Sequence, residues 1–134
     1  MKRSRRTVTA AALACAALTL VAVTAAAHTA KYDSKATLHL RLEQNGPSKW
    51  SGKVISGKHR CEAHRQVELK QVRKGGDGGV ATKFTDRDGR WRVLQRPTPG
   101  KRYYVRAKRK EWRSSGQRHV CKGAVSKKVT VPSS

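Results

Sequence analysis

The stretch Thr82–Trp91, TKFTDRDGRW, joins two runs of alternating polar and apolar residues and decides how the chain folds. Asp86, Asp88 and Gly89 resemble the beginning of a calcium-binding loop. Such a loop needs oxygen ligands at alternate positions and a Glu at the twelfth. Counted from Asp86, the fifth position is Arg90 and the twelfth is not Glu. The stretch therefore lacks the ligands that a calcium site of this kind requires.

The same residues suit a tight turn. An Asp side chain accepts backbone N–H groups across a turn, and Gly adopts the positive φ that other residues resist. We predict that Asp86, Asp88 and Gly89 form a structural turn in a β-hairpin. The hairpin would place Trp91 in the core opposite Phe84.

Working outward from this turn, further alternating runs predict short strands separated by Gly, Pro, Asn and Ser breaks. The expected strands are residues 37–43, 50–56, 65–72, 80–84, 90–94, 102–108 and 126–131. No run shows helical periodicity, and residues 57–60 are expected to be an exposed loop. The pattern indicates an all-β fold, an antiparallel seven-stranded β-sandwich over residues 36–131. Residues 28–35 would be an exposed lead-in, and residues 132–134 a tail.

The alternation also predicts which side chains form the core. Three leucines share one face of the first strand, and the later strands add mainly valines and aromatic residues. The expected core residues are Leu38, Leu40, Leu42, Val54, Ile55, Val67, Leu69, Val80, Phe84, Trp91, Val93, Tyr103, Val105, Val129 and Val131.

The N-terminus has the three parts of a secretory signal peptide. MKRSRR carries four basic residues, an Ala-rich apolar run extends from Val8 to Ala27, and residues 25–27 form a small-residue cleavage site. The prediction is a cleaved signal peptide over residues 1–27 and a secreted protein associated with the cell envelope. A retained membrane anchor is the alternative, and the sequence does not separate the Sec route from the twin-arginine route.

Cleavage would leave two cysteines, Cys61 and Cys121, in an oxidising compartment. An even cysteine count in a small secreted domain predicts a disulfide. The alternative is a zinc site formed with His64 and His119, but His119 and Cys121 are closer in sequence than the ligand pairs of zinc fingers. The disulfide is the favoured interpretation.

The motif T-D-x-x-G-x-W at residues 85–91, with Val93 two residues on and P-G-x-x-Y-x-V at residues 99–105, resembles a recurring feature of prealbumin-like domains. These domains include carboxypeptidase-regulatory-like and bacterial Ig-like modules. Gly52-Lys53-Val54, Cys61, Arg65, Val67, Cys121 and Ser126 are together similar to small secreted actinobacterial proteins of this type. The resemblance implies a two-sheet sandwich that acts as a non-catalytic binding or structural module, and it carries no catalytic residues.

Charge is the strongest functional feature of the sequence. Without residues 1–27 the chain keeps 27 basic and 8 acidic residues, a formal charge of +19 on 107 residues. Solubility of a small domain needs a charge of only about 2–8. On the expected strands the basic residues alternate outward: Arg41, Lys53, Lys70, Lys83, Arg92, Arg102, Arg106 and Lys108.

The segment 108–122 concentrates this charge around an aromatic residue, Trp112. Basic residues that neutralise a polyanion release counterions, and an exposed ring stacks on a base or sugar. The predicted polyanion-binding residues are Arg106, Lys108, Arg109, Lys110, Trp112, Arg113, Arg118 and Lys122. Outside the cell the partners would be wall polymers, anionic lipid surfaces, acidic polysaccharides or extracellular DNA. Packing within the loop is the alternative role for Trp112.

Arg65 has two interpretations, since alternation places it on the inward face with Val67 and Leu69. It would form an anion site, or it would bond Glu62, Glu68 or loop carbonyls, and the second interpretation is favoured.

Catalysis finds no support in the sequence. There is no G-x-S-x-G elbow and no His-x-x-x-His pair, and the acidic residues are scattered. We expect no enzyme, cofactor, metal or small-molecule substrate. The predicted function is a non-enzymatic module that associates electrostatically with anionic envelope or extracellular polymers. The alternative is a structural or protein-interaction module whose basic surface is incidental.

Overall fold

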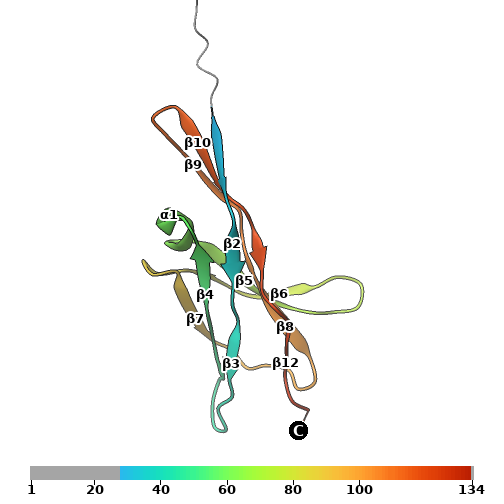
Figure 1. Ribbon diagram of the computed structural model, residues 1–134. Helices are drawn as coiled ribbons and strands as arrows, with labels where there is room; N and C mark the ends of the chain where they lie inside the picture. Colours follow the sequence, from blue (N-terminus) through green and yellow to red (C-terminus); the bar gives the residue numbers. More distant parts are fainter. Residues whose placement is uncertain (1–27, 134) are drawn as a thin grey trace, which may run out of the picture.

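The computed structural model describes residues 28–133, so the predicted signal peptide lies outside the described residues (Figure 1). The described chain is all-β, with antiparallel sheets and one short helix, α1 (His59–Glu62). That helix lacks the length and apolar character needed to cross a membrane. The strands are β1 (Thr29–Tyr32), β2 (Ser34–Ala36), β3 (His39–Arg41), β4 (Lys49–Ser56), β5 (Gln66–Gln71), β6 (Gly78–Phe84), β7 (Arg90–Leu94), β8 (Arg102–Ala107), β9 (Lys110–Ser114), β10 (Gln117–Cys121), β11 (Ala124–Val125) and β12 (Val129–Thr130).

One sheet is built on the long strand β4. β2 and β3 pair in succession with one edge of β4, and β7 pairs with the other, all antiparallel. Trp50 and Val54 on β4 are fully buried, whereas Lys49, Ser51 and Lys53 on the opposite face of the strand are only half-buried. Side chains alternate across a strand, so this sheet has an apolar inner face and a polar outer face.

A second sheet has the order β11-β8-β5-β6, and β12 also pairs with β8. Its inner side chains meet those of the β4 sheet in one core. The core residues are Leu38, Trp50, Val54, Val67, Leu69, Trp91, Tyr103, Val105, Ala107 and Val131. Trp50 and Tyr103 pack across the interior with their ring centroids 4.7 Å apart.

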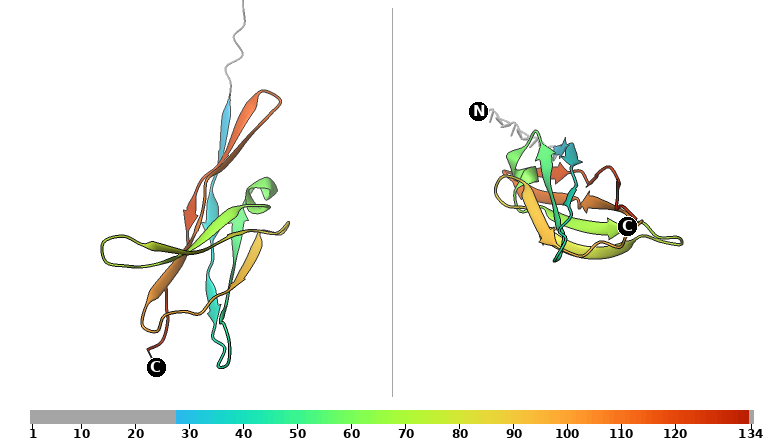
Figure 2. Two further views of the ribbon diagram at one scale, coloured as in Figure 1. Left: turned by 180° about the vertical axis from the view of Figure 1, so that it is seen from behind. Right: turned by 90° about the horizontal axis from the view of Figure 1, so that it is seen from below.

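The third sheet, β1-β10-β9, extends beyond one end of the other two (Figures 1 and 2). β9 and β10 form an antiparallel hairpin, and β1 runs parallel to β10. We call β1 together with residues 108–122 the arm. The two segments predicted to be a lead-in (28–35) and a basic loop (108–122) are therefore strands that pair with each other.

The prediction of seven strands differs from the twelve short strands of the structure. The expected first strand at 37–43 is shortened to β3, and β2 begins within the segment expected to be the lead-in; both pair with the same edge of β4. The expected loop at 57–60 runs into α1, a single helical turn that four residues are too few to reveal by periodicity. Pairing that is distant in sequence, such as β1 with β10, leaves no local pattern.

Three expected core residues lie at the surface: Leu42 (51% exposed), Ile55 (43%) and Phe84 (65%). Leu42 follows the end of β3, and Ile55 lies on the outer face of β4. The expected packing of Phe84 against Trp91 is also wrong. β6 pairs with β5 and β7 pairs with β4, so the turn between β6 and β7 crosses from one sheet to the other instead of closing a hairpin.

Candidate polyanion-binding surface

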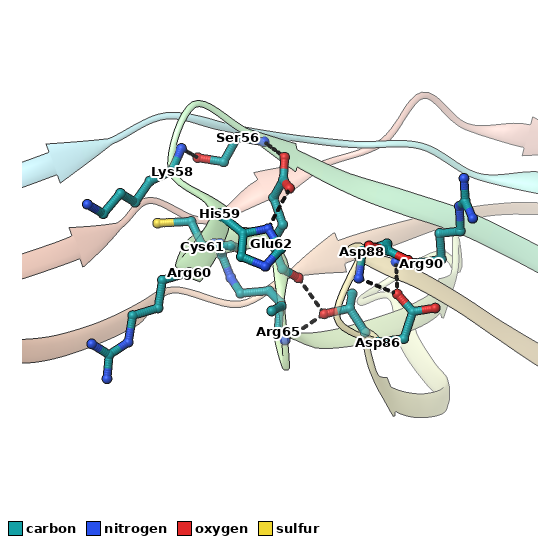
Figure 3. A network of polar contacts seen from close by, with 12 residues as sticks. Ser56, Lys58, His59, Arg60, Cys61, Glu62, Arg65, Asp86, Asp88 and Arg90 are labelled. Carbon is teal, nitrogen blue, oxygen red and sulfur yellow. Dashed lines mark hydrogen bonds and ion pairs between the residues drawn. The ribbon is translucent and has the colours of Figure 1, made fainter.

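A turn is present at Asp86, Asp88 and Gly89, as predicted, but it joins two sheets and does not close a hairpin. Asp86 Oδ1 accepts hydrogen bonds from the backbone N–H groups of Asp88 and Arg90, each at 2.9 Å (Figure 3). These bonds favour the ionised carboxylate, and the bond from Arg90 contributes most to lowering the pKa of Asp86. Gly89 has a φ of +80°. The carboxylate is thus used to hold the turn.

This turn is fastened to the segment around α1. Thr85, directly before the turn, is buried, and its hydroxyl accepts a hydrogen bond from the Arg65 N–H at 2.7 Å and donates one to the Glu62 carbonyl. Glu62 in turn accepts from the N–H of Ser56 at 2.8 Å. The Thr and Asp of the sequence motif therefore have structural roles.

Arg65 is 0% exposed, and it forms no ion pair with a carboxylate among residues 28–133. Its guanidinium donates to the carbonyl oxygens of Cys61, Lys108 and Lys122, and to the Ser34 hydroxyl at 3.2 Å. Burial lowers the pKa of Arg65 from its ordinary value. The interpretation as a carbonyl-bonding arginine is therefore confirmed, and these bonds occupy the donors that an anion would need.

The predicted disulfide is present, with Cys61 and Cys121 joined by an S–S bond of 1.99 Å. The zinc alternative thereby loses both of its thiolate ligands. No group of three or more His, Cys, Asp or Glu side chains among residues 28–133 is arranged to hold a metal ion.

Five of the seven cations predicted to bind a polyanion form ion pairs within the chain. Glu68 pairs with Arg106 at 3.2 Å and Lys108 at 3.9 Å, and Glu111 pairs with Arg118 at 2.8 Å and Arg109 at 3.1 Å. The remaining pair is Lys122 with Asp33, at 2.9 Å. The bond from Arg118 is the main cause that lowers the pKa of Glu111. The chain has only eight carboxylate side chains, and three of them, Glu68, Glu111 and Asp33, form these ion pairs.

Lys110 and Trp112 are also engaged within the protein. Lys110 Nζ donates to the carbonyl oxygens of Arg60 at 3.0 Å and Ala63 at 2.8 Å, and burial is the first cause that lowers its pKa. Trp112 lies parallel to the His119 ring at 4.9 Å between centroids, and the Arg60 guanidinium lies 4.9 Å from the Trp112 ring centroid. The packing alternative for Trp112 is the one that these contacts favour.

Arg113 is the remaining cation of the predicted set, and it forms no ion pair with any residue from 28 to 133. Alternation along β9 places Arg113 on the face opposite Lys110 and Trp112. The arm therefore does not gather the predicted residues into one cationic surface.

The outer face of the β4 sheet does gather unpaired cations. Lys53 lies opposite Arg90, and Ser51 lies between His39 and Arg92 in the strand register. No ion pair within residues 28–133 involves Lys49, Lys53, Arg90 or Arg92. The eight basic residues that were expected to alternate outward are all exposed or half-buried, as predicted.

A hollow of about 710 Å³ lies at this sheet. Its lining includes the four unpaired cations just named, two histidines, and the Phe84 and Trp91 rings. Asp86 is its one carboxylate, already bonded in the turn. The volume lies within the range of about 300–1,000 Å³ that is typical of small-ligand sites.

The comparisons with known proteins add no relative. No protein-family model, curated protein or solved structure matches this chain. The prealbumin-like resemblance therefore remains an expectation from the sequence.

Sequence reasoning missed this hollow, although Lys53 and Arg92 were expected to point outward. The informative signal was the even spacing of basic residues in both strands, which puts them on one face: Lys49 and Lys53 are four residues apart, and Arg90 and Arg92 are two apart. What the sequence did not contain was the register, which places β7 beside β4 and not beside β6.

Proposed function

We propose that this protein is a non-enzymatic, secreted module that associates electrostatically with anionic polymers of the cell envelope or the extracellular space. The observation that carries the proposal is the distribution of charge. Of the +19 formal charge beyond residue 27, the four cations Lys49, Lys53, Arg90 and Arg92 on the β4 sheet form no ion pair with a carboxylate among residues 28–133. The positive charges on this surface repel one another, and binding of a polyanion would offset that repulsion.

The proposal includes export and cleavage after Ala27. The disulfide supports an oxidising compartment, because such bonds form and persist mainly outside the cytosol. It also includes the finer fold assignment, a prealbumin-like or Ig-like sandwich. Two antiparallel sheets around one core support that assignment.

A salt series tests the function. The protein, expressed as the whole chain and purified from the medium of an exporting host, is titrated with a wall-polymer preparation and with a short DNA duplex. We expect log affinity to fall steeply and linearly with log salt concentration, because counterions are released on binding. No binding to either polymer at low salt would refute the proposal.

A structural or protein-interaction module is the second candidate. It is favoured by exposed apolar side chains on the same outer face, Ile55 on β4 and Leu94 (64% exposed) on β7. A packed protein interface depends much less on ionic strength than a polyanion contact. Binding that persists unchanged as salt rises would therefore favour this candidate.

A further inference from the structure

We infer that the hollow on the β4 sheet is the polymer-binding site and that its ligand is a glycan carrying anionic groups, either phosphodiesters or carboxylates. This inference rests on the proposed function and adds the site and the class of polymer. The alternative location, the arm, has most of its cations already paired with Glu68, Glu111 and Asp33.

The arrangement of cations in the hollow suits a linear polymer. Lys49 and Lys53 are four residues apart on one strand, which separates their Cα atoms by about 13 Å. Arg90 and Arg92 are two residues apart on the neighbouring strand, about 7 Å. The cations therefore form two adjacent rows along the strand direction, able to contact successive anionic groups of one chain.

The arginines and lysines of the hollow would contact anionic groups in different ways. A guanidinium presents paired donors that match phosphate or carboxylate oxygens, whereas an ammonium acts as a point charge. His39 and His64 line the same hollow and add ring N–H donors. Asp86, the one carboxylate in the lining, accepts two backbone bonds, so four cations outnumber a single anion that is already bonded.

Phe84 distinguishes a glycan from a ligand bound by charge alone. It is 65% exposed at the end of β6 and forms part of the lining, so an apolar ring faces solvent beside the cations. A sugar ring has an apolar face that packs on such a ring while its charged substituents reach the cations. Single-stranded nucleic acid is bound on several aromatic residues in succession, and here Phe84 is the one exposed Phe, Tyr or Trp in the lining, since Trp91 is 5% exposed.

Trp91 provides a local reporter. It lines the hollow, and its Nε1 is the one buried side-chain polar atom without a hydrogen-bond partner among residues 28–133. Trp50 Nε1, by contrast, donates to the Gln95 carbonyl at 3.0 Å in the interior. A ligand in the hollow should shift the indole N–H resonance of Trp91 and leave that of Trp50 in place.

The first test compares two triple variants that remove the same charge. The site variant is Lys49→Gln, Lys53→Gln and Arg92→Gln. The control variant is Lys74→Gln, Lys127→Gln and Arg102→Gln, which changes exposed residues outside the lining. Each protein is titrated with a phosphodiester-bearing wall glycan, a uronic-acid glycan, a neutral glycan and a DNA duplex, and its thermal midpoint is measured to verify folding.

We expect the site variant to lose on the order of 100-fold in affinity for an anionic glycan, with a salt slope smaller by up to about 3. The control variant should lose less than about tenfold. The preferred anionic glycan identifies the anionic group, and the neutral glycan should not bind. Equal losses in the two variants would overturn the assigned site while leaving the proposed function intact. Failure of the unaltered protein to bind any polymer would overturn both.

A second comparison tests the glycan class. Phe84→Ala should lower affinity for the anionic glycan several-fold without changing the salt slope, and should leave inorganic polyphosphate binding unchanged. Leu94→Ala is the matched control, since Leu94 is equally exposed but does not line the hollow. If DNA binds as tightly as the glycan and depends equally on Lys53 and Arg92, the glycan assignment is wrong.

Discussion

Arg65 donates a hydrogen bond from Nη1 to the carbonyl oxygen of Cys61 at 2.8 Å, which ties a fully buried guanidinium to one residue of the disulfide. The same group bonds Ser34, Lys108 and Lys122. These three residues lie where the chain passes between the arm and the two-sheet body. Arg65 thus fastens the chain at each of the three places where it passes between the arm and the body. The Cys61–Cys121 disulfide also attaches the end of β10 in the arm to α1 in the body.

Replacement of Arg65 by Met should therefore destabilise the protein strongly. The substitution removes the donors to the carbonyl groups of Cys61, Lys108 and Lys122, and each buried group left unsatisfied costs about 1–3 kcal/mol. We expect the free energy of unfolding, measured by urea denaturation without reductant, to fall by at least about 3 kcal/mol. Arg65→Lys should rescue only part of this loss, because an ammonium does not reproduce the fork of donors.

Arg113→Met is the matched control for Arg65. Arg113 is exposed and forms no ion pair within the described chain, so its replacement should change stability by less than about 0.5 kcal/mol. A loss at Arg65 no larger than that at Arg113 would show that the buried guanidinium does not hold the arm.

Removal of the disulfide should lower the free energy of unfolding by an amount comparable to that expected for Arg65→Met. The bond closes a loop with a sequence separation of 60 residues, for which the chain-entropy model gives about 4 kcal/mol. The double variant Cys61→Ala, Cys121→Ala should lower the denaturation midpoint, and added reductant should lower the unaltered protein to the same midpoint while leaving the double variant unchanged. Two free thiols in the unreduced protein lacking residues 1–27 would contradict the bond.

Much of the body could be predicted from the sequence because its strands alternate locally. Residues 50–56, 65–72, 90–94 and 102–108 were each expected to be strands, and β4, β5, β7 and β8 lie within one residue of those bounds. The disulfide was predictable because only two cysteines follow the apolar leader. The turn at Asp86 was predictable because its hydrogen bonds close within five residues.

Pairing between distant segments was not predictable, and it decides both the arm and the hollow. No local pattern near residues 29–32 indicates that they pair with β10. Thr29 pairs with Arg118, which is 89 residues further along the chain. The cations of segment 108–122 looked free in sequence, yet Glu68 on β5 pairs with Lys108, directly after β8, at 3.9 Å. With so few carboxylates, the register of the sheets determines which cations remain unpaired.

The Asp77–Tyr104 contact should make stability depend on pH. Asp77 accepts a hydrogen bond from the Arg73 backbone N–H at 3.1 Å and another from the Tyr104 hydroxyl at 2.8 Å. Both bonds lower the pKa of Asp77, and the bond from Arg73 contributes most. A lowered carboxylate pKa stabilises the fold above the unfolded value of about 3.9, and this contribution is lost as pH falls through the folded pKa. The bond to Asp77 raises the pKa of Tyr104, so its contribution is present below about 10 and is lost as pH rises through the folded pKa.

Thermal melts across pH test this pair. Asp77→Asn should melt below the unaltered protein at neutral pH, and the gap should close in strong acid, where Asp77 is protonated in both states. Asp88→Asn is the control, because the Asp88 carboxylate makes no hydrogen bond or ion pair within residues 28–133. A gap that stays constant from neutral pH to strong acid would show that ionisation of Asp77 is not its cause.

Gly89→Ala should destabilise the crossing between the two sheets more than a positive φ alone explains. Gly89 has a φ of +80°, and a Cβ there would lie 2.5 Å from the Val54 carbonyl oxygen and 3.1 Å from Glu62 Cβ. Val54 also donates its N–H to the Gly89 carbonyl at 2.8 Å, so the turn has little freedom to move away from β4.

Gly75 provides the control, with a φ of +86° and no atom within 4 Å of its Cβ position. Gly75→Ala should cost about 1 kcal/mol for backbone strain, and Gly89→Ala at least about 2 kcal/mol more from the added steric overlap. Equal losses in urea denaturation would mean that the turn relaxes and that the contact with β4 does not hold the crossing in place.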